Sequence, residues 1–206
     1  MTTVTAMKDV AAKVLAGERI TPEEGLYLLK EAPLLDLGSL AQEVRYRHNP
    51  KQVVTFVIDT NLNYTNVCDA YCTFCAFYRT EKDDDAYTYT VEQVMEMVGQ
   101  AAAKGVTTVL LQGGLNPKIP MEYYEELVRE TRRRYPQVLP HYFSAPEIQK
   151  MSQVSEMSVS EVLRRLKEAG QETLPGGGSE ILSDQVKRRL SRLWPKGRVK
   201  DWTEVH

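Results

Sequence analysis

The chain changes to a β pattern at Val53-Val54-Thr55-Phe56-Val57-Ile58, a short run of apolar and β-branched residues. Such a run is typical of a strand that is buried on both faces of a parallel sheet. Three more strands are predicted downstream, over residues 107–112, 140–144 and 172–175. Helical patterns separate the strands, so the chain from residue 53 onward is a βαβαβαβα series. This order predicts an α/β fold with one parallel sheet and right-handed crossovers.

Helices are predicted from the spacing of apolar residues and from capping pairs such as Thr21 with Glu24 and Thr90 with Gln93. The expected helices cover residues 4–14, a segment that begins at Thr21, and residues 37–47, 91–104, 121–135, 159–169 and 184–193. The first three precede any strand. We therefore expect an N-terminal helical segment over residues 1–50, followed by a parallel α/β region over residues 51–206.

The composition places the chemistry in a local site. The chain has 206 residues, of which 26 are basic and 28 acidic, for a net charge of −2. This near balance gives no whole-chain field that would select nucleic acid or an anionic membrane as a partner. No stretch approaches the roughly 20 apolar residues of a membrane span, and the N-terminus lacks the basic start and apolar block of a signal peptide. We therefore expect a cytoplasmic protein with no nucleic-acid or membrane partner, whose chemistry comes from a local site.

The loops after the strands are where we expect that site, because functional groups of a parallel α/β sheet lie just beyond the strand C-termini. The first loop, residues 59–79, has about twenty residues, against the usual two to six of a strand–helix connection. The other three loops carry Gly113-Gly114, residues 144–147 and residues 176–180. Each therefore holds glycine or small polar residues where a ligand could approach the backbone.

The long first loop contains all three cysteines of the chain, Cys68, Cys72 and Cys75. Their spacing lets one compact loop wrap a metal centre, and three thiolate ligands leave one coordination position open. A zinc site that takes His48 or His141 as its fourth ligand is an alternative, as are three unligated thiols. Zinc sites commonly use two separate cysteine pairs, and no second pair exists here. The sequence therefore favours a metal centre with an open position.

The pattern Cys-x3-Cys-x2-Cys, with the aromatic Phe74 before the last cysteine and a βα series around it, resembles the radical S-adenosylmethionine (SAM) superfamily. The resemblance implies a [4Fe–4S] cluster held by Cys68, Cys72 and Cys75, with SAM bound at the iron that lacks a cysteine. It also implies reductive cleavage of SAM to a 5′-deoxyadenosyl radical, with an electron donor such as flavodoxin or ferredoxin. The superfamily core is a partial TIM-type barrel of six strand–helix units.

The resemblance extends to other positions of the cofactor site. Phe74 is expected to lie against the adenine of SAM. Gly113-Gly114 matches the pair that offers backbone groups to the methionine part of SAM, although the acidic residue that often follows is Leu115 here. Glu180 is the candidate for binding the ribose hydroxyls, with a solvated carboxylate at a helix N-terminus as the alternative.

A narrower resemblance covers most of the chain and is carried by residues 63–66, 72–79, 111–117, 143–148 and 174–182. These runs are similar to the menaquinone-biosynthesis branch of the superfamily, and within it most to the dehypoxanthine futalosine cyclases. The resemblance implies that the adenosyl radical takes a hydrogen atom from the ribose of dehypoxanthine futalosine, which then closes a spiro ring. Aminofutalosine synthase and a deazaflavin-cofactor synthase subunit share these motifs in outline and stay as alternatives.

A substrate with a benzoate carboxylate and sugar hydroxyls calls for a basic or amide-rich pocket. The polar residues that are nearby in the pattern are Arg79, Asn61, Asn63 and Gln112. Arg79 could equally pair with Asp59 or Glu81, so none of these residues receives a firm role. Ser144 and Glu147 either face the cofactor or substrate, or cap the next segment.

Length sets one further expectation. About four of the six barrel units fit between residue 53 and the last residue, and residues 199–206 have the pattern of another helix. We therefore expect the 206 residues to be the N-terminal part of such an enzyme, with the C-terminal units missing. A rival from a different class is a noncatalytic metal-binding relative that keeps the cysteine motif without turnover.

Overall fold

The computed structural model describes residues 7–191 and 197–206, and the chain divides into two compact units, Met1–Phe56 and Val57–His206. The described part of the first unit contains the helices α1 (Met7–Ala16), α2 (Pro22–Lys30) and α3 (Leu34–His48). All three helices were predicted. The start of the first predicted helix, residues 4–6, lies outside the described residues.

The first unit is held by a helix cap and by contacts between its helices. Thr21 caps α2: its hydroxyl accepts from the Glu24 backbone N–H at 3.2 Å, and the Glu24 carboxylate accepts from the Thr21 N–H at 2.7 Å. The same carboxylate accepts a hydrogen bond from Lys13 Nζ of α1 at 2.7 Å. Arg47 of α3 donates to the Leu15 carbonyl at 3.2 Å. Glu24 therefore joins α1 to the start of α2.

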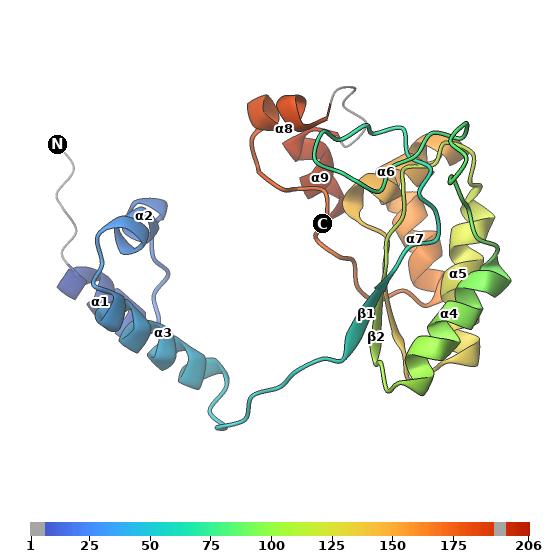
Figure 1. Cartoon of the computed structure of the whole chain (residues 1–206). Helices are drawn as coiled ribbons and strands as arrows, with labels where there is room; N and C mark the ends of the chain where they lie inside the picture. The colour runs from blue at the N-terminus through green and yellow to red at the C-terminus, as the bar shows by residue number, and fades with distance from the viewer. Residues whose placement is uncertain (1–6, 192–196) are drawn as a thin grey trace. The chain divides into compact units, whose positions relative to one another are not determined.

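The second unit is built on a parallel sheet of three strands among the described residues (Figure 1). Its strands are β1 (Asp59–Leu62), β2 (Thr108–Leu111) and β3 (Leu139–Tyr142), in the order β1-β2-β3. The register aligns Asp59 with Thr108, and Thr108 with Leu139. The second and third predicted strands are thus confirmed. The carboxyl ends of all three strands meet at one edge of the sheet.

The predicted position of the first strand is wrong. Residues 53–58 form no strand, and the Phe56 side chain in this run is 85% exposed. The strand forms instead at Asp59, because its partner β2 starts only at Thr108. The Thr107 N–H donates to the Ile58 carbonyl at 2.9 Å, just ahead of the paired residues. Among the described residues no strand lies beside the apolar run, and a strand needs backbone partners as well as β-branched side chains.

The predicted fourth strand is reduced to a single bridge, in which Thr173 pairs in parallel with His141. A side chain explains why pairing stops there. Gln171 Nε2 donates to the Tyr142 carbonyl at 2.7 Å and thereby occupies an acceptor of β3 that a longer strand would use. The chain still runs along β3 before it turns into the glycine-rich loop at residues 176–178.

The described helices of the second unit are α4 (Val91–Ala103), α5 (Met121–Arg134), α6 (Ala145–Ser155), α7 (Val159–Ala169), α8 (Asp184–Leu190) and α9 (Val199–Val205). Each of them except α6 was predicted, and the expected end of α8 at residues 192–193 lies outside the described residues. Helix α6 begins at the capping pair Ser144 and Glu147, for which a cap of the next segment was one of the two predicted roles. Along the unit, α4 packs on α5, α5 on α7, α7 on α6, and α6 on α9.

The core lies between the sheet and these helices. Its largest fully buried side chains include Tyr64, Leu111, Leu127, Tyr142 and Phe143. Each large apolar side chain that is fully buried contributes about 1.5–3 kcal/mol relative to an exposed one. Residues that immediately follow strands β1 and β3 are therefore anchored in the core, which fixes the loops at the carboxyl edge of the sheet.

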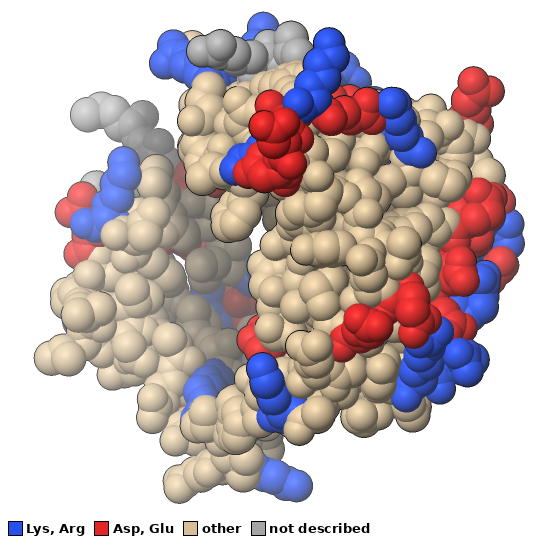
Figure 2. Space-filling view, turned by 45° about the vertical axis from the view of Figure 1, so that its right-hand side comes forward, with Lys and Arg blue, Asp and Glu red and all other residues tan. Residues whose placement is uncertain are grey.

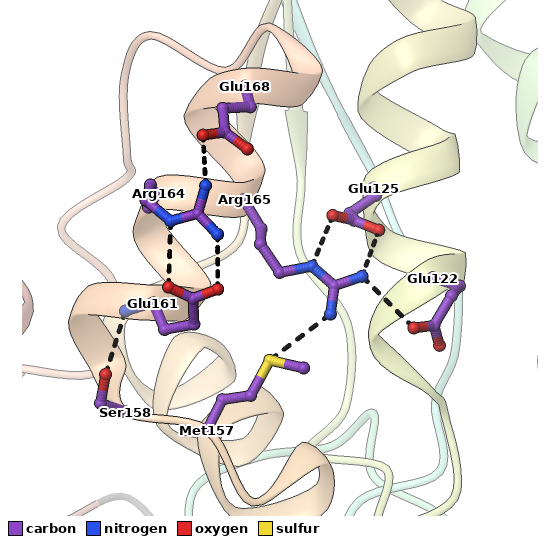
Figure 3. Close-up of polar contacts among 8 residues, drawn as sticks. All are labelled: Glu122, Glu125, Met157, Ser158, Glu161, Arg164, Arg165 and Glu168. Atoms are coloured by element: carbon purple, nitrogen blue, oxygen red, sulfur yellow. Dashed lines mark hydrogen bonds and ion pairs between the residues drawn. The ribbon is translucent and has the colours of Figure 1, made fainter.

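Ion pairs join α5 to α7 on the outer side (Figure 3). Arg165 of α7 donates from Nε and Nη2 to the two carboxylate oxygens of Glu125 of α5, each at 2.7 Å, and its Nη2 also approaches Glu122 at 3.3 Å. Its neighbour Arg164 pairs instead with Glu161 and Glu168 of its own helix. Arg165 and Glu125 are largely buried, with side-chain exposures of 19% and 12%. This pair therefore contributes to helix packing, whereas the Arg164 pairs lie on the surface.

Acidic and basic side chains lie next to one another on the face seen in Figure 2, where the view shows no broad field of one sign. Ion pairs of α5 include Arg134 with Glu92 and Arg133 with Glu130. None of the described helices is both long and apolar enough to cross a membrane.

Candidate functional site

A cavity of about 330 Å³ opens at the carboxyl edge of the sheet. Its walls come from the loops after β1, β2 and β3, with Gly178 from the glycine-rich loop. This is the location that the parallel topology predicts for a ligand site. The lining is mostly uncharged and includes cysteine, aromatic, amide, hydroxyl and glycine residues.

All three cysteines line this cavity. Cys72 is buried with 5% exposure, and Cys68 and Cys75 are partly buried. They pack with Ala70 and Leu115 in a small apolar cluster that is separate from the main core. Burial raises the pKa of the Cys68 thiol above its usual value. The structure thus brings the three thiols to one wall, as their spacing in the sequence suggested.

One of the histidines considered as a fourth zinc ligand does not line the cavity. His141 is in β3, where its Nδ1 is 2.7 Å from the Thr173 hydroxyl. The other, His48, ends α3 of the first unit. Within the described part of the chain, no three His, Cys, Asp or Glu side chains are grouped closely enough to hold a single metal ion.

The cysteine loop is fastened to the rest of the unit at both ends. The Cys68 N–H donates to the Arg79 carbonyl at 3.0 Å, which closes the loop on itself. The Thr73 N–H donates to the Leu190 carbonyl at 2.8 Å, and the Ser191 hydroxyl donates to the Ala70 carbonyl at 2.8 Å. The C-terminal end of α8 therefore covers the loop, although it is more than a hundred residues away in sequence.

Helix α6 contacts the same loop through a partly buried ion pair. Lys150, whose side chain is 9% exposed, donates from Nζ to Asp69 Oδ2 at 2.7 Å. Asp69 directly follows Cys68, and its N–H donates to the Leu115 carbonyl at 3.2 Å. Its other carboxylate oxygen, Oδ1, is buried without a hydrogen-bond partner in the described residues. These contacts tie the first cysteine to α6 and to the loop after β2.

Gly113-Gly114 packs directly against the loop after β1. A β-carbon on Gly114 would lie 2.1 Å from the Val67 carbonyl oxygen, and one on Gly113 would lie 2.6 Å from the Tyr64 ring. No side chain fits at these distances, so both glycines are required for the close approach of the two loops. The Gly114 N–H donates to the Thr65 carbonyl at 2.9 Å. The pair therefore has a packing role, whatever it contributes to a ligand.

Glu147 forms a buried hub behind the glycine pair. Its Oε1 accepts from the Tyr64 hydroxyl at 2.8 Å and from the Gly113 N–H at 2.9 Å. Its Oε2 accepts from the Ser144 N–H at 2.7 Å and from the Ser144 hydroxyl at 2.6 Å. Burial raises the pKa of Glu147, and these donors oppose the rise. One carboxylate thus joins the loops after all three strands.

Sequence reasoning named Glu147 and Ser144 but gave Tyr64 no role. The only signal for Tyr64 was its place in the run at residues 63–66, directly after the first strand. Its partner Glu147 is 83 residues away, so no local pattern could pair them.

The other predicted site residues differ in their placement. Phe74 lines the cavity and is 55% exposed, and Ser144 lines it from the start of α6. Glu180 is exposed and does not line this cavity, although Gly178 of the same loop does. Its backbone has a φ of +39°, in the left-handed region.

The polar residues considered for the substrate also separate. The amides of Asn61, Asn63 and Gln112 line the cavity, whereas Arg79 does not. Arg79 pairs with Asp85 at 2.7 Å and donates to carbonyls of its own loop. The pairing of Arg79 with Asp59 or Glu81 is therefore wrong, since Asp85 holds its guanidinium.

A comparison with known protein families identifies the family of this chain. Residues 62–206 match the model of the radical SAM superfamily. The chain belongs to the radical SAM superfamily. Members of this superfamily use a [4Fe–4S] cluster and S-adenosylmethionine, and the matched residues include the cysteine loop, the glycine pair and Glu147.

Curated radical SAM relatives in the futalosine pathway resemble the chain along most of its length. It is 39% identical to the cyclic dehypoxanthine futalosine synthase of Halalkalibacterium halodurans over 188 residues, which are 91% of this chain and 51% of that protein. It is 36% identical to the aminodeoxyfutalosine synthase of Streptomyces coelicolor over 199 residues, which are 97% of this chain and 51% of that protein. The chain thus spans about half the length of the curated relatives it matches.

The fold agrees with a solved radical SAM structure. The crystal structure of methylornithine synthase (PylB) matches with a TM-score of 0.65 at 18% identity, covering 95% of this chain and 54% of that one. The parallel sheet with its outer helices is therefore the partial barrel expected from the sequence, preceded by helices at the N-terminus.

The residues present fit the cluster that the superfamily uses. The three ligand candidates are all thiols, which are the ligands that iron–sulfur clusters prefer. They lie on one wall of a single cavity, and the described lining of that cavity offers no fourth thiol or imidazole. A cluster held by these three thiols would have one iron without a protein ligand, next to space for a second ligand.

Proposed function

We propose that Cys68, Cys72 and Cys75 hold a [4Fe–4S] cluster and that the adjoining cavity binds SAM. When bound, these cofactors would supply a 5′-deoxyadenosyl radical. The observation that carries this proposal is the convergence of three thiols from one loop on a cavity that is also lined by Gly113 and Gly114. The thiols are the protein's ligands, and the buried loop contacts keep them on one wall.

The remaining lining residues receive roles by position. Phe74 would cover the adenine, because it directly precedes Cys75 and lines this cavity with a 55% exposed side chain; Phe77 of the same loop also lines the cavity. Asn61, Asn63 and Gln112 would contribute amide groups toward the cofactor or substrate. The ribose role of Glu180 would require a movement of the loop at residues 176–180, since Glu180 lies outside the cavity lining.

The reaction proposed is the cyclisation of dehypoxanthine futalosine in menaquinone biosynthesis. The support is the 39% identity to a cyclic dehypoxanthine futalosine synthase, over nearly the whole of this chain. In this reaction the 5′-deoxyadenosyl radical would take a hydrogen atom from the substrate ribose and become 5′-deoxyadenosine, and the resulting carbon radical would add to the aromatic ring to close a spiro ring. The ring-closed radical would then give one electron to a one-electron acceptor and lose one proton to form the product. An electron donor such as flavodoxin or ferredoxin would supply the electron that SAM cleavage consumes.

Product analysis tests this assignment. The anaerobically reconstituted chain is given a reductant, SAM and dehypoxanthine futalosine, and 5′-deoxyadenosine and cyclised product are measured by mass spectrometry. We expect 5′-deoxyadenosine from the wild-type chain and none from Cys72→Ala, and cyclised product formed alongside it would identify the cyclase reaction. Cluster assembly without 5′-deoxyadenosine would contradict the proposed SAM chemistry and support a noncatalytic relative that keeps the motif.

Aminodeoxyfutalosine synthase is the second candidate, favoured by the 36% identity over 199 residues. The two reactions use different substrates, so the same assay with the substrate of that enzyme separates them. Turnover of that substrate, with none of dehypoxanthine futalosine, would overturn the cyclase assignment and leave the cluster site intact. The deazaflavin-cofactor synthase reaction is distinguished in the same way by its own substrates.

A further inference from the structure

Glu147 stands out among the residues that line the cavity. It is the one acidic residue in the described lining, and only 2% of it is exposed. All four of its hydrogen bonds are accepted from protein donors, two on each oxygen. Because an ionised carboxylate is an acceptor only, it can serve all four donors at once, which neither an amide nor a protonated acid can do.

Glu147 helps to fix the peptide that joins Gln112 to Gly113. The N–H of Gly113 is bound by Glu147 at 2.9 Å. The carbonyl of the same peptide belongs to Gln112 and accepts from the Asn63 side-chain amide. Its plane is therefore held from both sides, by groups from the loops after β1 and β3.

The next peptide is oriented by this arrangement. Its N–H, on Gly114, donates to the Thr65 carbonyl at 2.9 Å. Its carbonyl, on Gly113, accepts no hydrogen bond within the described part of the chain, while Gly113 itself lines the cavity. This carbonyl is therefore an acceptor without a partner among the described residues, and it belongs to a residue that lines the cavity.

We propose that Glu147 is a positioning residue for SAM: it holds the Gly113 peptide so that the Gly113 carbonyl can accept a hydrogen bond from the ammonium group of the methionine part. This inference rests on the proposed function. Tyr64 acts through the same oxygen, because its hydroxyl shares Oε1 with the Gly113 N–H. The role needs no contact between Glu147 and the ligand.

The alternative is that Glu147 only stabilises the fold by capping α6 and anchoring Tyr64. The two roles differ in what they do to ligand affinity once the chain is folded. A purely structural residue lowers the melting temperature but leaves the affinity of the folded chain for SAM unchanged. A positioning residue changes that affinity while the iron content stays constant.

Three variants separate these roles. Glu147→Gln replaces one carboxylate oxygen by an NH₂ group that faces two donors, so that side of the hub is lost. Tyr64→Phe removes one of the two donors to Oε1 of Glu147, so that only the Gly113 N–H then holds this oxygen. Tyr142→Phe is the matched control, because Tyr142 is also a fully buried tyrosine whose hydroxyl has one partner, Thr131 at 2.8 Å, away from the cavity.

The chain and each variant are reconstituted anaerobically, and three quantities are measured: iron per chain, melting temperature, and the affinity for SAM from the change in the electron paramagnetic resonance (EPR) signal of the reduced cluster. We expect wild-type iron content throughout. Glu147→Gln should weaken SAM binding about tenfold or more, and Tyr64→Phe several-fold, in line with the loss of one or two hydrogen bonds. Tyr142→Phe should lower the melting temperature without changing the affinity.

Wild-type SAM affinity in Tyr64→Phe and Glu147→Gln would overturn the proposal, as would an equal loss of affinity in Tyr142→Phe. If Glu147→Gln does not fold, Tyr64→Phe decides alone. The failure of the proposed function has a separate signature, since a wild-type chain that takes up no iron, or whose cluster signal does not respond to SAM, would refute the cofactor site itself. That result would also refute the positioning role of Glu147, because the role requires SAM to bind at this site.

Discussion

Gly114 shows how closely the candidate site is packed at the level of single residues. A β-carbon at this position would lie 2.1 Å from the Val67 carbonyl oxygen and 2.9 Å from Cys68 Cβ. The obstacle is backbone rather than the end of a flexible side chain, so it cannot move aside cheaply. The glycine therefore sets the distance between the loop after β2 and the first cysteine.

Gly114→Ala is expected to destabilise the protein by roughly 1–3 kcal/mol, the usual cost of overpacking a tight site. It should also reduce iron uptake, because the cysteine loop must shift to admit the methyl group. Gly176→Ala is the control, since a β-carbon there meets nothing within 4 Å. Urea denaturation and iron analysis measure both effects, and equal behaviour of the two variants would contradict this account.

Glu24 gives a pH dependence in the first unit. The Lys13 ammonium group and the Thr21 N–H lower the pKa of Glu24 below its ordinary value of 4.5. A carboxyl group with a lowered pKa stabilises the folded state above its unfolded pKa, and this contribution is lost as the pH falls through the folded value. We therefore expect the α1–α2 contact to weaken on acidification below pH 4.5.

An NMR titration of the Glu24 side chain in the full chain measures this effect. The pKa should lie below 4.5 in the wild type and move toward it in Lys13→Met, which keeps the apolar stem of the side chain. A pKa at or above 4.5 in the wild type would show that the ion pair does not hold the carboxylate in its charged form.

Residue-level patterns in the sequence predicted that the three cysteines come together at one site, but they did not predict the hydrogen bonds that converge on Glu147. Cys68, Cys72 and Cys75 lie within one loop, so their spacing alone brought them together. Tyr64 and Glu147 meet only after the sheet has formed, and such a contact leaves no local pattern. The exposure of Glu180 likewise depends on the path of the loop at residues 176–180, which the sequence does not determine.

At the scale of helices and strands, local signals were reliable and partner-dependent ones were not. The capping pair Thr90 with Gln93 forms as predicted, because its donors and acceptors lie within one turn. The first strand depends on where β2 begins, so it forms at Asp59 and not in the apolar run before it. The length of the predicted fourth strand depends on the free carbonyl acceptors of β3, and the Gln171 side chain occupies one of them.

Helix α7 offers a prediction at this scale, because its two neighbouring arginines make different contacts (Figure 3). Arg165→Met should lower the free energy of unfolding by about 1–2 kcal/mol, since it leaves the largely buried Glu125 without its bidentate partner. Arg164→Met should cost much less, because its partners are exposed residues of the same helix. Urea denaturation measures both, and a larger loss for Arg164→Met would contradict the assignment of Arg165 to helix packing.

At the scale of the whole molecule, the residues of the candidate site lie between Asn61 and Gly178 and belong to one compact unit. The matched relatives are about twice as long as the aligned region. The cysteine wall, the glycine pair and the Glu147 hub are nevertheless complete within this unit. The cluster and SAM part of the site can therefore be tested on this chain separately from turnover of the substrate.

The most direct test of the central claim is the metal content of the chain after anaerobic reconstitution with iron and sulfide. The account predicts about four irons per chain with broad absorbance at about 400 nm, as a cysteine-bound [4Fe–4S] cluster would give. Both should be lost in Cys72→Ala, whose thiol is buried at the cavity. A colourless wild-type chain that takes up zinc instead of iron would contradict the account.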